Sequence, residues 1–177
     1  MSLEKYIEFF SNLKPLRVGG RAKPHQACLL LAMIDLIDEG ILTDNRIPFD
    51  TSLTDAFSRR FATFSQAGDD DNPALPYFHL TSQRFWRLRA VAGQEVELDS
   101  RLASRKAPSA SATTKLIEYA MLDDDLYRLL QVDGNRSVLI GVLESSLLNT
   151  TAKKPKTTTR PIVFGEIEGI EEGHWFA

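Results

Sequence analysis

The chain has 177 residues, of which 43% are hydrophobic and 25% are charged. This composition is typical of one globular domain with its own core, and it excludes a disordered, collagen-like or coiled-coil chain. The 21 basic and 24 acidic residues give a formal net charge of −3, which by itself disfavours a nucleic acid as the partner.

The first part of the chain predicts three helices. Residues 2–13 place apolar side chains at helical spacing and form the first helix. The second helix covers residues 25–38 and stops at Gly40; because it is apolar on almost all sides, we expect it at the centre of the core. Residues 41–49 predict a short strand, and residues 50–64 predict an amphipathic helix with an aspartate cap.

The middle of the chain predicts a loop and a hairpin. Residues 68–76 (GDDDNPALP) have loop composition. Residues 77–80 and 84–90 then predict two short strands that pair with each other.

The last part of the domain predicts helices again. Residues 102–114 predict an irregular segment or a loosely packed helix, and residues 123–131 and 135–148 predict two further helices. We expect these apolar side chains of the last helix to face inwards: Val138, Leu139, Val142, Leu143 and Leu147. The predicted fold class is mainly α with a small β component, as a single compact helical domain with a short β-hairpin.

The charge is unevenly distributed along the chain. We expect residues 1–149 to form the domain, residues 150–162 to form a linker, and residues 163–177 to form an acidic tail or the truncated start of another domain. The last fifteen residues hold four glutamates and no Lys or Arg. Affinity for phosphate depends on local patches, so the net charge does not exclude DNA.

The histidine, cysteine and acidic residues of the chain match no catalytic motif. The three histidines, His25, His79 and His174, lack a metal-ligand spacing, and there is no P-loop or nucleophile motif. Cys28 is the only cysteine, which excludes an internal disulfide, and its apolar helix predicts a buried structural thiol. Residues 69–71 predict a solvated acidic loop. We therefore interpret the chain as a binding module with no cofactor and no metal. Because residues 1–15 lack a signal-peptide pattern, we expect it in the cytoplasm.

Two segments carry most of the functional information. In residues 21–28 a basic connector leads into a helix that begins with His25 and Gln26, and a helix N-terminus with such donors suits an anion. The structural alternative is a histidine that only caps its helix. The second segment is residues 72–80 (NPALPYFHL) followed by residues 85–88 (FWRL), with Pro76 placed at the entry of a strand.

Together these segments resemble the sulfur-binding domain of McrA-like type IV restriction enzymes. The resemblance extends over residues 1–149 and includes YAMLDDDLYRLLQ and NRSVLIGVLESSLL in the C-terminal half. It implies a reader of double-stranded DNA in which a phosphorothioate replaces a phosphate. The family pattern often has an aromatic residue where this chain has Leu75, and a basic residue where it has Gln26.

The resemblance also implies a site. A proline in the matching position forms the sulfur pocket, so Pro76 is the first candidate, with Leu75, Tyr77, His25 and Gln26 beside it. An arginine is expected to complete the pocket, with Arg101 as first choice and Arg105 as second. The predicted contacts to DNA phosphates are Arg17, Arg21, Lys23, Arg84 and Arg105.

The tail provides a separate resemblance. Residues 163–177 (VFGEIEGIEEGHWFA) are similar to the start of an SRA (YDG) domain, which in such enzymes is often followed by an HNH nuclease. The implied partners in a longer protein are therefore SRA and HNH domains. Two other functions stay open: a DNA-positioning domain without sulfur preference, and a protein-interaction module that uses Phe61, Phe64 or Trp86.

Overall fold

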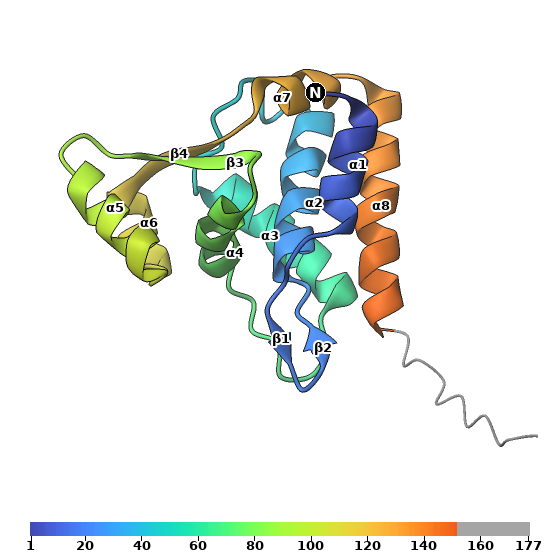
Figure 1. Cartoon of the computed structure of the whole chain (residues 1–177), viewed down its shortest axis with the longest axis horizontal. Coiled ribbons are helices and arrows are strands. Elements are labelled where there is room, and N and C mark those ends of the chain that lie inside the picture. The colour runs from blue at the N-terminus through green and yellow to red at the C-terminus, as the bar shows by residue number, and fades with distance from the viewer. Residues whose placement is uncertain (152–177) are drawn as a thin grey trace, which may run out of the picture.

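The computed structural model describes residues 1–151 of the chain. Its body is a group of helices: α1 (Leu3–Ser11), α2 (His25–Asp38), α3 (Thr51–Phe64) and α8 (Asp133–Thr151). α2 packs against both α3 and α8, and α1 packs against α8 (Figure 1). Along α2 every side chain from Gln26 to Ile34 is buried, which confirms its predicted central position.

Local sequence signals explain where two of these helices begin and end. The Asp50 carboxylate accepts a hydrogen bond from the Leu53 backbone N–H at 3.0 Å, so the predicted cap of α3 is confirmed. The chain leaves α2 through Gly40, whose φ of 72° lies in the left-handed region that glycine adopts without strain. Cys28 is buried within α2, and burial raises the pKa of its thiol to about 12.

A second part of the domain extends from this body on the left of Figure 1. It contains an antiparallel pair of strands, β3 (Trp86–Ala90) and β4 (Ile117–Leu122), with α5 (Glu95–Ser104) and α6 (Ala110–Leu116) between them in the chain. The sequence analysis predicted β3 but missed both β4 and α5. The prediction for residues 102–114 was partly wrong, since α5 ends and α6 begins within that range.

The predicted hairpin of residues 77–80 with residues 84–90 is wrong. Residues 74–79 instead form α4 (Ala74–His79), which continues into the 3₁₀ turn η1 (Leu80–Ser82). The helix accommodates Pro76 because this residue lies in its first turn, where a missing N–H breaks no intrahelical hydrogen bond. The strand predicted at residues 41–49 is also wrong, since in this range only Ile47 makes an isolated bridge, to Ala120.

The hairpin of the structure lies elsewhere. β1 (Arg17–Val18) pairs with β2 (Arg21–Ala22), and Gly19 and Gly20 form the turn with φ values of 60° and 79°. A two-residue turn with positive φ at both positions matches the twist of the strands, and it needs residues such as glycine. The segment predicted only as a connector is therefore a short hairpin.

The C-terminal helices agree largely with expectation. α7 (Asp124–Leu129) and α8 confirm the last two predicted helices, and α8 directs Leu139, Leu143 and Leu147 into the core. The inward placement of Val138 is wrong, since 43% of this side chain is exposed. α8 reaches Thr151, so it includes the first two residues of the predicted linker; the rest of the linker and the tail lie outside the described residues. No helix in the described part of the chain is long and apolar enough to cross a membrane.

Candidate nucleic-acid interface

A cavity of about 690 Å³ lies where four parts of the chain meet. Its walls come from residues on either side of the β1–β2 hairpin, the N-terminus of α2, the segment 66–73 before α4, and α4 and η1 with the end of α5. The hairpin, the N-terminus of α2 and α4 lie in the lower half and centre of Figure 1, and α5 lies on its left. The predicted site residues that line it are Lys23, His25, Gln26, Leu75, Pro76 and Arg105.

The N-terminus of α2 forms one wall. His25 donates from its ring Nε2 to the backbone carbonyl of Asp70 at 2.7 Å, and its ring packs against Phe61 at a centroid distance of 5.0 Å. Gln26 is only 8% exposed, and its Oε1 is buried without a hydrogen-bond partner within residues 1–151. An unpaired buried polar group costs about 1–3 kcal/mol, so this oxygen is an acceptor left open at the cavity.

The first turn of α4 forms the apolar wall. Leu75 is 38% exposed and Pro76 is buried, and both line the cavity. Tyr77 does not line it, because the next residue of a helix is rotated by about 100° to another face. Its hydroxyl donates to the Ile47 carbonyl at 2.7 Å, and burial raises the pKa of this phenol well above its usual value. Tyr77 is therefore a core residue behind this wall.

Of the two candidate arginines, the structure places Arg105 at the cavity. Arg101 instead lies one turn earlier on α5 and pairs with Glu97 at 2.9 Å. Arg105 ends α5 with φ 55° and ψ 33°, and it is the only residue other than glycine with positive φ in the described part of the chain. This conformation costs roughly 1 kcal/mol for a residue with a Cβ. Such outliers concentrate at functional sites.

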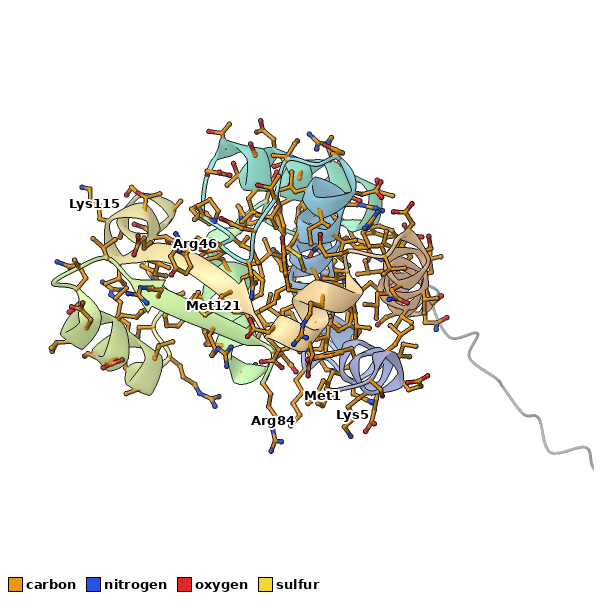
Figure 2. The ribbon with its side chains drawn as sticks, turned by 90° about the horizontal axis from the view of Figure 1, so that it is seen from above. Met1, Lys5, Arg46, Arg84, Lys115 and Met121 are labelled. Atoms are coloured by element: carbon orange, nitrogen blue, oxygen red, sulfur yellow. The ribbon has the colours of Figure 1, made fainter. Side chains whose placement is uncertain are left out.

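The other predicted phosphate contacts differ in their surroundings. Arg17 is exposed on the hairpin, where it donates to the Gly20 carbonyl at 3.3 Å. Arg21 and Lys23 are both paired with the carboxylate of Asp69. Arg84 does not line the cavity, and Figure 2 shows its side chain extending away from the body of the domain. Lys23 lines the cavity and Arg21 is joined to it through Asp69, whereas Arg17 and Arg84 do not line the cavity.

The sequence analysis missed several lining residues, of which His79 is the most informative. Burial and the charge of Arg105 lower the pKa of His79, so it stays neutral near pH 7. Its position, four residues after Leu75 and three after Pro76, is the spacing of one helix face. This spacing would have identified His79 if residues 74–79 had been predicted as a helix. The other lining residues that were missed are Lys14, Leu16, Gly68, Asp70, Phe78, Thr81, Ser82 and Leu102.

The protein-interaction alternative is affected by the structure. Phe61, Phe64 and Trp86 are 5%, 8% and 1% exposed, so the interaction surface expected from these three residues is wrong. Within residues 1–151 no group of three or more His, Cys, Asp or Glu side chains is arranged to hold a metal ion.

Comparison with known proteins gives a family match and a structural match. Residues 3–151 match the family described as "ScoMcrA-like, DNA sulfur-binding domain". A solved structure described as "Sulfur binding domain of SprMcrA complexed with phosphorothioated DNA" is similar with a TM-score of 0.57 and 16% sequence identity. The match covers 85% of this chain and 93% of that chain. At this identity the similarity shows a shared fold. Among curated proteins none matches this chain.

Proposed function

Because the chain belongs to the ScoMcrA-like DNA sulfur-binding domain family, its function is the recognition of sulfur-modified DNA, and we propose that the cavity at α2 and α4 holds the phosphorothioate. The observation that carries this proposal is the meeting of an apolar wall with a helix N-terminus and an arginine in one cavity. Leu75 and Pro76 supply the wall, and Gln26 and Arg105 supply the polar side.

The apolar wall suits sulfur better than oxygen. A phosphorothioate replaces one non-bridging oxygen by a sulfur atom that is larger and more weakly hydrated, so its transfer to apolar surroundings costs less free energy. Pro76 offers a rigid ring and has no N–H group that prefers oxygen. The pairing of sulfur with this wall is therefore the source of discrimination.

The polar wall suits the remaining oxygens and the neighbouring phosphates. The first N–H groups of α2 have no intrahelical acceptor and lie at the positive end of the helix dipole. The Arg105 guanidinium provides charge-assisted hydrogen bonds, and Lys14 and Lys23, which also line the cavity, add positive charge at the same opening. These contacts provide affinity for the DNA backbone, and the apolar wall provides the direct contact that separates sulfur from oxygen.

The test is a comparison of two duplexes of identical sequence, one with a single phosphorothioate and one without. Burial of one sulfur against an apolar wall is worth about 1–3 kcal/mol, which corresponds to roughly 5- to 150-fold tighter binding of the modified duplex. Equal affinities contradict the proposal and leave a DNA-positioning domain without sulfur preference.

We also propose a place for this domain in a larger enzyme. The resemblance of residues 163–177 to an SRA domain supports a protein in which a linker, an SRA domain and an HNH nuclease follow the sulfur-binding domain. In that protein the domain directs a restriction endonuclease to modified DNA in the cytoplasm. The present chain should bind modified DNA without cutting it when Mg²⁺ or Mn²⁺ is added, and cleavage by the purified chain contradicts this division of roles.

A further inference from the structure

Asp69 connects the hairpin to the segment that leads into α4. Its carboxylate accepts hydrogen bonds from the Arg21 guanidinium and from Lys23 Nζ, the latter at 2.6 Å. The second carboxylate oxygen accepts from the backbone N–H of Gln66 at 2.8 Å. The Asp69 side chain is fully buried by these partners, so the acidic run is not simply the solvated loop that the sequence predicts.

Asp69 remains ionised over the whole neutral range. Burial of the carboxylate opposes ionisation, but the hydrogen bonds from Lys23, the Gln66 N–H and Arg21 together lower its pKa to about 2. The two cations are largely covered as well, with 23% of the Arg21 side chain and 17% of the Lys23 side chain exposed. The three groups thus form a fixed unit with a net charge of +1.

This unit lies next to the proposed sulfur site. Lys23 lines the cavity, and so does Asp70, whose carbonyl accepts the hydrogen bond from His25. The same segment continues directly into α4, which carries Pro76. The ion pairs of Asp69 therefore join the cationic side of the cavity to its apolar side.

We propose that Asp69 is a positioning residue that increases discrimination between sulfur and oxygen by holding Arg21 and Lys23 in place. The inference rests on the proposed function of the cavity. A long cationic side chain that moves freely can follow any phosphate, and it stabilises modified and unmodified DNA alike. A cation that is fixed relative to Pro76 contributes its full binding free energy only in one register of the DNA backbone. That register is the one that places sulfur on the apolar wall.

The experiment compares Asp69→Asn with Asp71→Asn in the full chain. Asp71 is exposed two residues further along, so both substitutions remove one negative charge from the same segment. Dissociation constants are measured for the modified and unmodified duplexes over a range of salt concentrations, with circular dichroism as the control for folding.

Asp71→Asn should strengthen binding of both duplexes by a similar factor and leave their ratio unchanged. Asp69→Asn should strengthen binding of the unmodified duplex further and reduce the sulfur preference several-fold. The slope of log affinity against log salt concentration for the unmodified duplex should steepen by about one for each cation that is released. A second outcome is that the unaltered chain prefers sulfur while Asp69→Asn and Asp71→Asn give the same ratio of dissociation constants and the same salt dependence. That result overturns only the role of Asp69. If the unaltered chain has no preference, the proposed function fails and this role fails with it.

Arg21→Gln provides a second test in case Asp69→Asn does not fold. Glutamine keeps a donor for Asp69 but removes the charge, and Lys23 remains as the cationic partner. We expect binding of the modified duplex to weaken by a larger factor than binding of the unmodified duplex. Equal losses for both duplexes contradict the fixed position of Arg21.

Discussion

The helical body and the walls of the cavity are stabilised in different ways. The body is built on α2, whose side chains are buried on almost every side by α3 and α8. The walls depend on ion pairs around Asp69, a hydrogen bond from His25 to a loop carbonyl, and a left-handed residue at Arg105. Apolar burial needs little geometric accuracy, whereas a charged site works only when its groups are fixed in position. Substitutions in the body should therefore change stability, and substitutions in the walls should change recognition.

The largest stability effect is expected in the body. Leu30→Ala removes a fully buried side chain from the middle of α2 and should lower the free energy of unfolding by about 2–5 kcal/mol, as measured by urea titration. Leu75→Ala is the matched change in the cavity wall, where the side chain is 38% exposed, and should cost much less stability but reduce the sulfur preference. A similar stability loss for the two variants contradicts the separation of the two regions.

The next largest effect is expected on the affinity for modified DNA when the arginine at the cavity is removed. Glycine adopts the left-handed conformation of residue 105 without strain, so Arg105→Gly should leave the fold at least as stable while removing the guanidinium. A hydrogen bond to a charged group contributes about 1.5–3 kcal/mol, so affinity for modified DNA should fall by roughly 10- to 150-fold. Arg101→Ala, one turn earlier, is the control and should change affinity little; the reverse order would assign the pocket arginine to Arg101.

A smaller and more selective effect is expected for the proline. Pro76→Ala keeps the helix but removes two methylene groups from the apolar wall, and about 1 kcal/mol of contact with sulfur is expected to be lost. Binding of the modified duplex should therefore weaken several-fold, while binding of the unmodified duplex changes little. An unchanged ratio places the sulfur contact elsewhere in the cavity.

The smallest effect concerns pH. Burial, together with Arg105, lowers the pKa of His79 below its ordinary value, so the unfolded chain binds a proton more readily than the folded chain. The contribution of His79 to stability should be complete above the unfolded pKa, about 6.5, and decline as the pH falls below it. His79→Asn should flatten this part of the pH–stability curve, and an unchanged curve would exclude His79 as its source.

The sequence predicts the body much better than the walls. α2 was predicted because its apolar residues run without interruption from Ala27 to Ile34 and need no partner to be recognised. α4 was missed because Pro76, followed by Tyr77 and Phe78, has the composition of a strand entry, although proline is equally compatible with the first turn of a helix. Local composition does not separate these two conformations.

The distribution of charge in the site was harder still to predict. The run of residues 69–71 has the composition of a solvated loop, and the burial of Asp69 depends on Arg21 and Lys23, which are 48 and 46 residues earlier in the chain. The choice between Arg101 and Arg105 depends on the left-handed turn that ends α5. Both features follow from tertiary contacts, which a pattern of residue types does not contain.

The most direct measurement is the titration of the full chain with the two duplexes that differ by a single sulfur atom. The cavity of Leu75, Pro76, Gln26 and Arg105 predicts a dissociation constant about 5- to 150-fold lower for the modified duplex, with both affinities falling steeply as salt rises. Equal dissociation constants at every salt concentration would contradict the recognition of sulfur by this cavity.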